Sequence, residues 1–235
     1  MMIRRGNCVA CTKKKFSLFS ELNGKELSCL DDNRSFITYK KGETILKTGM
    51  KVPGLICLSS GKAKIIKELT EGKELIIHLA KPVEFIGFRE MLGEVPSCVT
   101  VVALEDCDIC IIEKSNFMKV LNDNIDFAKR IIKHLATELV RQDNRLITLT
   151  QKYMRERLAE ALTMLNEAYN GKDGYLSITL SREEIASIAN MSRSNAIRTL
   201  YDFEKEKMVA LKGKKIRILQ PDKLTEVSSG SNGTY

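Results

Sequence analysis

The chain has 235 residues, of which 43% are hydrophobic, and this is enough apolar sequence to bury a core and to exclude a wholly disordered protein. Its formal net charge of +8 favours an anionic partner, of which nucleic acid is the commonest. No apolar run approaches the roughly 18 residues of a membrane helix, and the N-terminus lacks the apolar segment of a secretory signal, so we expect a cytoplasmic protein without membrane association.

Short β-rich runs separated by glycines fill residues 35–113, after a polar extension (residues 1–16) and a short helix with Leu22, Leu27 and Leu30 as its apolar positions. The runs are SFITY, ETILKTG, GLICLSSG, AKIIKEL, ELIIHLA, CVTVVALE and CDICIIE. Short strands with regular turn signals predict a small antiparallel roll, barrel or sandwich.

A helical period begins at Ile125 and forms a heptad seam that extends to Tyr153. Ile131, Val140 and Ile147 add a second apolar stripe, so one stripe can pack on the roll while the other meets a second copy of the chain. We predict a parallel homodimer helix over residues 125–153, with a helix packed only inside its own chain as the alternative. The predicted dimer contacts are Ile132, Leu135, Leu139, Gln142, Leu146 and Leu149, and the polar Gln142 would fix the register.

A further amphipathic helix is expected at Met154–Tyr169, followed by a turn at residues 170–174. The Ser-Arg-Glu-Glu sequence at residues 181–184 then predicts a capped helix. Asn190 suits a sharp turn because Asn tolerates the left-handed conformation. Ser192 can cap a second helix that begins at Arg193. This pattern is typical of a helix-turn-helix, and the alternative is two packed helices with a solvated basic loop.

The second helix would present polar side chains to the major groove, where Arg pairs with guanine and Asn with adenine. Residues 209–219 predict a basic hairpin, or wing, suited to phosphate contacts. The predicted DNA-binding residues are Arg182, Ser192, Arg193, Ser194, Asn195, Arg198, Thr199, Lys212, Lys214 and Lys215.

The order of roll, long helix and winged helix-turn-helix resembles the Crp/Fnr family of bacterial transcription regulators over about residues 17–224. The strongest match is LSREEIASIANMSRSNAIRTL at residues 180–200, and HLAKPVEFIGF at residues 78–88 resembles the Fnr-type roll. The resemblance implies an α+β fold with an N-terminal β-roll of the cyclic-nucleotide-binding type (a double-stranded β-helix). It also implies a homodimer that binds an inverted repeat in double-stranded DNA, and it is compatible with RNA polymerase as a partner. The expected domains are an extension (1–16), the β-roll sensor (17–124), the dimerisation helix (125–153), the winged helix-turn-helix (154–224) and a flexible tail (225–235).

Departures from the family pattern concern the effector and the DNA half-site. Family members that bind cyclic AMP carry a Gly-Glu pair and a later Arg, whereas Phe88 follows Gly87 here and the segment from Ser97 to Val99 has no Arg. A buried phosphate without a charge partner is costly, so cyclic AMP is not expected, although Arg89 lies one position away. The expected effector pocket comprises Phe85, Gly87, Phe88, Arg89, Ser97 and Cys98. The family's usual half-site is not assumed either, because Ser194 replaces the Glu that many members carry.

The oxygen-sensing branch of the family holds an iron–sulfur cluster on N-terminal cysteines and one cysteine of the roll. Cys8, Cys11 and Cys110 match such ligands, but the third N-terminal ligand falls near Ser17, a poor replacement for a thiolate. Cys107 forms a second pair with Cys110, yet residues three apart on a strand point to opposite faces.

Three interpretations of the cysteines therefore stay open: an iron–sulfur cluster or zinc, a thiol redox switch, or no metal at all. A metal-free protein would use Cys29, Cys57, Cys98 and Cys107 as small buried core residues. Haem bound through His78 or His134 has less support, because no haem attachment motif is present.

No catalytic constellation is present in the sequence, and an enzyme is not expected. The leading hypothesis is a transcription regulator whose roll senses a signal. The alternative is a sensory or regulatory subunit that binds a protein through the roll and docks through its C-terminal domain. A docking helix would carry an apolar anchor in its first turn, where this chain has polar residues.

Overall fold

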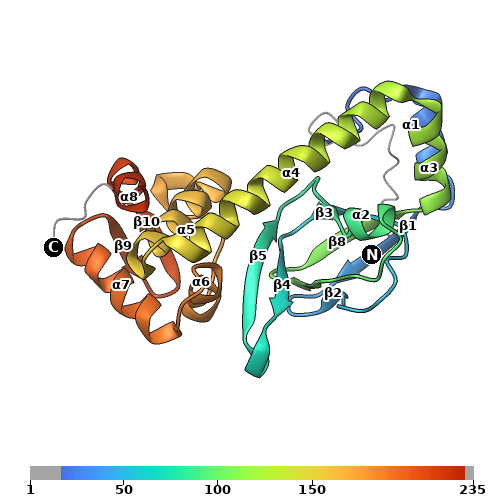
Figure 1. Ribbon diagram of the computed structural model, residues 1–235. Coiled ribbons are helices and arrows are strands. Elements are labelled where there is room, and N and C mark those ends of the chain that lie inside the picture. Colours follow the sequence, from blue (N-terminus) through green and yellow to red (C-terminus); the bar gives the residue numbers. More distant parts are fainter. Residues whose placement is uncertain (1–16, 231–235) are drawn as a thin grey trace. The chain divides into compact units, whose positions relative to one another are not determined.

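The computed structural model describes residues 17–230, which form two compact units with the division between Leu139 and Val140 (Figure 1). The long helix α4 (Ile125–Gln151) ends the first unit and begins the second. No helix in the described range is long and apolar enough to cross a membrane.

The first unit is built around two antiparallel four-stranded sheets (Figure 1). One sheet has the order β1-β8-β3-β6 and the other the order β2-β7-β4-β5. The seven predicted strands are confirmed, with boundaries shifted by a few residues at most, whereas the short strand β6 was not predicted. The strands are β1 (Ser35–Tyr39), β2 (Thr44–Leu46), β3 (Leu55–Ser60), β4 (Ala63–Glu68), β5 (Glu74–Ala80), β6 (Phe85–Ile86), β7 (Thr100–Ala103) and β8 (Cys107–Ile112), with the 3-10 turn η2 (Thr70–Gly72) between β4 and β5.

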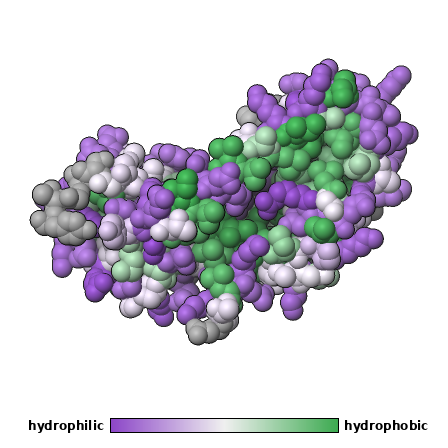
Figure 2. Space-filling model, in the orientation of Figure 1, coloured by the Kyte–Doolittle hydropathy of each residue, from purple (hydrophilic) through white to green (hydrophobic). Residues whose placement is uncertain are grey.

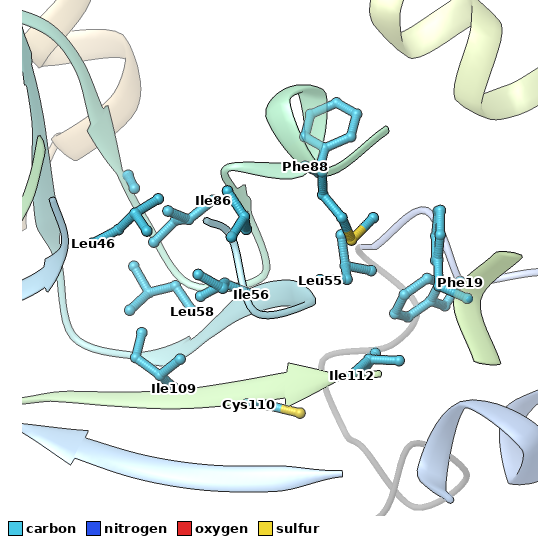
Figure 3. Close-up of a cluster of buried hydrophobic side chains, with 14 of the residues drawn as sticks. Phe19, Leu46, Leu55, Ile56, Leu58, Ile86, Phe88, Ile109, Cys110 and Ile112 are labelled. Carbon is cyan, nitrogen blue, oxygen red and sulfur yellow. The ribbon is translucent and has the colours of Figure 1, made fainter. Parts of the chain in front are cut away.

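The core of the first unit includes buried side chains of the sheet β1-β8-β3-β6 (Figure 3). Leu58 and Ile109 lie opposite each other in the β3–β8 pair, and both are buried. Figure 3 places them in one group with Leu46 and Ile86, while Leu55 lies nearer to Phe19. β3 is therefore buried on both faces, which explains its nearly continuous apolar sequence.

Among the described residues of the first unit, three helices precede α4: α1 (Gly24–Asp31), α2 (Phe88–Leu92) and α3 (Lys114–Asp123). The expected N-terminal helix is confirmed as α1, whose capping box joins Asn23 to Glu26. The sequence pattern did not predict α2 or α3. Phe117 of α3 is buried and stacks edge-on against Phe127 of α4, with ring centroids 5.8 Å apart.

The second unit contains the predicted winged helix-turn-helix (Figure 1). Its elements after α4 are α5 (Met154–Tyr169), η3 (Lys172–Gly174), α6 (Arg182–Ile188), α7 (Arg193–Lys205), β9 (Val209–Lys212), β10 (Lys215–Ile218) and α8 (Pro221–Ser228). The prediction of a flexible tail from residue 225 is wrong for residues 225–228. These residues belong to α8, which packs on α5 and buries Leu224 and Val227.

Candidate nucleic-acid interface

The turn between α6 and α7 has the conformation that the sequence predicts. Ser181 caps α6 by accepting from the amide of Glu184, and the Glu184 carboxylate accepts from the amide of Ser181. Asn190 adopts a φ of 49°, in the left-handed region. Ser192 then caps α7 by accepting from the amide of Asn195 at 3.2 Å. Side-chain caps therefore begin both helices, and the left-handed backbone of Asn190 ends α6.

One face of α7 fixes the helix in the second unit. Ala196, Leu200 and Phe203 are fully buried, at positions three and four residues apart. The guanidinium of Arg155, from α5, lies 4.7 Å from the centroid of the Phe203 ring. Because these contacts anchor one side of α7, the opposite side is left for solvent or a ligand.

The predicted reading residues are not equally exposed. Arg193, Ser194 and Arg198 are exposed, whereas Thr199 is half-buried. Asn195 is also half-buried, and its amide donates to the Met154 sulfur at 3.2 Å. Arg198 donates to the Asn195 side-chain oxygen, also at 3.2 Å. The prediction that Asn195 faces outward is therefore only partly correct, because both the nitrogen and the oxygen of its side-chain amide are bonded within the unit.

The wing is a tight hairpin in which β9 pairs with β10 and Lys212 lies opposite Lys215. Gly213 has a φ of 59°, which suits a short hairpin loop. Lys212, Lys214 and Lys215 are all exposed. Arg182 donates to the Gly213 carbonyl at 2.9 Å, so its guanidinium ties α6 to the wing.

The predicted seam on α4 leaves large apolar side chains uncovered. Ile125, Ile132, Leu139 and Leu146 follow one another at steps of seven, and each is more than 60% exposed. Green hydrophobic residues reach the surface along α4 in Figure 2. Gln142 is exposed, and Leu149 is half-buried. Leu135 is half-buried against the core of the first unit, so it belongs only partly to the exposed seam.

The second stripe has two different environments. Ile131 is buried in the core of the first unit, as expected for packing on the roll, whereas Val140 and Ile147 are exposed. The helix also ends at Gln151, and Tyr153 precedes α5, so the predicted helix over residues 125–153 is slightly too long.

The expected effector residues divide into separate environments. Phe85 and Phe88 contact each other and belong to an aromatic cluster, in which the ring centroids of Phe19 and Phe85 are 5.0 Å apart. Gly87 has a φ of 66°, and a Cβ there would lie 3.1 Å from a Leu46 methyl group. Arg89 is exposed.

Ser97 and Cys98 occupy a third environment next to α2. Ser97 is buried, and its hydroxyl donates to the Val99 carbonyl at 2.8 Å. The Cys98 thiol donates to Glu90 at 3.0 Å. Glu90 is a carboxylate that is only 5% exposed, and nothing in the amphipathic pattern of the sequence marked it. Although Cys98 as a residue is exposed, partial desolvation of its thiol is the main reason that the pKa of this thiol is raised, and its bond to Glu90 raises that pKa further.

The described cysteines also differ from the expectation for a metal-free core. Cys107 is fully buried, Cys29 and Cys57 are half-buried, and Cys98 is exposed, so Cys98 was wrongly assigned to the core. Burial is likewise the main reason that the pKa of the Cys107 thiol is raised.

The predicted metal ligands and haem ligands are only partly described. Cys110 is buried on β8 opposite Cys57 of β3, whereas Cys8 and Cys11 lie outside the described residues. Within residues 17–230, no three His, Cys, Asp or Glu side chains are placed to hold a metal ion. His78 is bonded to Glu84 at 2.7 Å, and His134 stacks on Phe88.

Comparison with known proteins places both units in established families. Residues 36–124 match the family model of the cyclic nucleotide-binding domain, and residues 156–227 match the Crp-like helix-turn-helix domain. Together these matches cover well over half of the chain.

Individual relatives agree with this assignment. The transcriptional activator protein Anr of Pseudomonas protegens is 22% identical, over 97% of this chain and 94% of its own. A CRP-like cAMP-activated global transcriptional regulator of Mycobacterium tuberculosis is also 22% identical, over 88% of this chain and 94% of its own. The structure of FixK2 from Bradyrhizobium japonicum has the same fold, with a TM-score of 0.72 and 20% identity over 83% of this chain and 96% of that one. The chain belongs to the Crp/Fnr family and is a DNA-binding transcription regulator of that type.

Proposed function

We propose that the protein is a homodimer whose two α7 helices read the two halves of an inverted repeat. The observation that carries this proposal is the exposed stripe on α4. Ile132, Leu139 and Leu146 are each more than 60% exposed, at the spacing of a coiled-coil seam. Three large side chains of this kind in one row would be covered by the same row of a second copy related by a two-fold axis.

In such a dimer, two recognition helices would enter successive major grooves on one side of the duplex. The half-site centres would then lie about 34 Å apart, one turn of DNA. Arg193 and Arg198 are the exposed arginines of α7 and would contact base edges, most favourably guanine. The lysines of the wing would contact phosphates and hold the register.

The test combines sedimentation with selection from random duplexes. The wild type should sediment as a dimer and select an inverted repeat. Leu139→Glu should give a folded monomer without specific binding, because it would place like charges across a buried interface. Leu69→Glu is the matched control, since Leu69 is an exposed leucine of the first unit outside α4 and its replacement should leave the dimer intact. A dimeric Leu139→Glu protein would refute this seam, and selection without an inverted repeat would refute the proposed site.

Substitutions in α7 test base reading separately. Arg193→Ala should reduce operator affinity by about 1–3 kcal/mol and relax specificity at one position of each half-site. An equal loss of affinity for every sequence would assign Arg193 to phosphate contact instead.

The controlling signal is proposed to act on the first unit. Of the three cysteines that match family metal ligands, Cys110 lies in this unit on β8. Absorption spectra and metal analysis of protein purified without oxygen would distinguish a cluster, haem, zinc and a metal-free protein. If metal or oxidation controls DNA affinity, replacing Cys8 and Cys11 with Ser should abolish any difference between anaerobic and aerated protein. Equal affinities in wild type, without metal or chromophore, would leave these cysteines without that role.

A further inference from the structure

The end of α6 leaves a row of backbone carbonyls that the helix-turn-helix does not satisfy by itself. The amides of Asn190 and Met191 donate to the carbonyls of Ser187 and Ala186, at 3.3 and 3.0 Å. These bonds form the Schellman pattern, which ends a helix where the next residue is left-handed. The carbonyls of residues 188–190 follow this pattern and need donors from elsewhere in the unit.

Two arginines outside the helix-turn-helix supply those donors. Arg157 of α5 donates from Nε to the Ala189 carbonyl at 2.9 Å and from Nη2 to the Asn190 carbonyl at 3.0 Å. Arg145 of α4 donates to the Ile188 carbonyl. A helix C-terminus carries a partial negative charge, so two cations are electrostatically favoured here.

The same arginines belong to a network that joins α4 to α5. Arg157 also donates from Nη1 to the Lys152 carbonyl at 3.0 Å. Glu160 accepts from the Thr148 hydroxyl and from the Lys152 ammonium, each at 3.0 Å. Burial lowers the pKa of the Arg145 guanidinium, and Glu160 offsets part of that effect. An arginine nevertheless stays protonated at neutral pH, so both guanidinium groups remain cations.

We infer that Arg145 and Arg157 are positioning residues that fix the direction of the recognition helix α7 relative to the part of α4 that belongs to the second unit (residues 140–151), and thereby set the specificity of DNA binding. Three successive carbonyls of a short turn are bonded to side chains of two longer helices, so the turn cannot act as a free hinge. Arg145 makes this connection from the helix that carries the proposed dimer seam. The inference rests on the proposed reading of DNA by α7.

Arg157→Lys tests this role without changing the charge. One ammonium cannot reproduce a planar fork that bonds the carbonyls of Lys152, Ala189 and Asn190. Affinity for the selected operator should fall by at least roughly tenfold, equivalent to about 1.4 kcal/mol. Affinity for random duplex, which depends on charge, should change by less than about twofold. Arg34→Lys is the charge-preserving control, because Arg34 lies in the first unit and pairs there with Asp31 at 3.1 Å, and it should leave both affinities unchanged.

Hydrogen exchange in the DNA-free protein provides a readout that does not depend on the proposed function. The amides of Asn190 and Met191 should exchange at least roughly ten times faster in Arg157→Lys than in wild type. Unchanged exchange together with unchanged operator specificity would overturn the inference. Faster exchange in a protein whose wild type selects no operator would support the positioning role and contradict the proposed function.

Arg145→Lys keeps the test decisive if Arg157→Lys does not fold, because Arg145 makes only one of the three bonds to the turn. DNA affinity and hydrogen exchange are then measured on Arg145→Lys. Operator affinity should again fall, and the amides of Asn190 and Met191 should again exchange faster. Loss of folding in both variants would assign the arginines to stability alone and overturn the inference.

Discussion

At the scale of single residues, the structure distinguishes the exposed side chains of α7 from the side chains that restrain them. Arg198 is exposed, while Asn195 is half-buried between Arg198 and Met154. The neighbouring amide therefore restrains the Arg198 guanidinium before DNA arrives, and this reduces the entropy lost on binding.

Asn195→Ala should consequently relax specificity at the base position that Arg198 reads. The affinity loss should be smaller than that of Arg198→Ala, for which about 1–3 kcal/mol is expected. Selection from random duplexes with each variant checks this. If the two variants relaxed different base positions, Asn195 would instead read a base of its own.

The pair of Cys98 and Glu90 gives a second residue-scale prediction. Since burial and Glu90 raise the pKa of the Cys98 thiol, less thiolate is present at pH 7 than in an ordinary cysteine. Alkylation of Cys98 should be slow at pH 7 and should accelerate as the pH rises. Glu90→Gln should lower that pKa and speed alkylation at neutral pH, because it removes the adjacent negative charge.

Mass spectrometry of each labelled cysteine measures this effect. Cys107 is the internal control, since its thiol is fully buried and bonded to the carbonyls of Lys62 and Glu105. It should stay unlabelled until the protein unfolds. Native Cys98 reacting at neutral pH as fast as a small free thiol would contradict the prediction.

At the scale of elements, residues at the helix ends determine where α6 and α7 begin and where α6 ends. Ser181 and Ser192 begin α6 and α7, and Asn190 ends α6 in a left-handed conformation. These are local interactions within a few residues of each other, so they favour the helix-turn-helix before tertiary packing is complete.

Asn190→Ala should destabilise the second unit by about 1 kcal/mol, because alanine lacks the tolerance of asparagine for positive φ. Asn190→Gly is the matched control, because glycine adopts this conformation at little cost. Thermal unfolding should show a lower Tm for the alanine variant than for the glycine variant. Equal Tm values would show that the φ of Asn190 is not what constrains this residue.

At the scale of the whole molecule, affinity for DNA should combine base reading by α7 with charge attraction by the wing. Replacing both Lys214 and Lys215 with Ala should weaken binding to all sequences alike. The salt dependence should become less steep, by about 0.9 in the log–log slope for each phosphate that the wing no longer neutralises.

Lys40→Ala is the control for the charge change, because Lys40 is exposed in the first unit and paired with Asp106 at 2.7 Å. It should leave the slope unchanged. Titrations at several salt concentrations, on operator and on random duplex, check both expectations. A loss confined to the operator would show that the wing lysines read sequence.

Local patterns in the sequence are enough to predict the order of roll, long helix and winged helix-turn-helix, and all strands of the roll except the two-residue β6. Each is marked by a period or by a cap that acts over a few residues. These patterns could not give α2 and α3, or the course of residues 221–228, because the apolar side chains that stabilise these short helices face partners distant in the sequence.

Which face of each element is buried depends instead on tertiary packing. Packing places Ile131 in the core while Ile132 stays exposed, and it leaves Cys98 exposed. It also brings the guanidinium groups of Arg145 and Arg157 to the end of α6. These arginines look like ordinary charged positions on helices, and their role depends on carbonyls more than 30 residues further along the chain. A local sequence pattern cannot reveal such interactions, because the packing of the helices sets the distance between each guanidinium group and the carbonyl that it bonds.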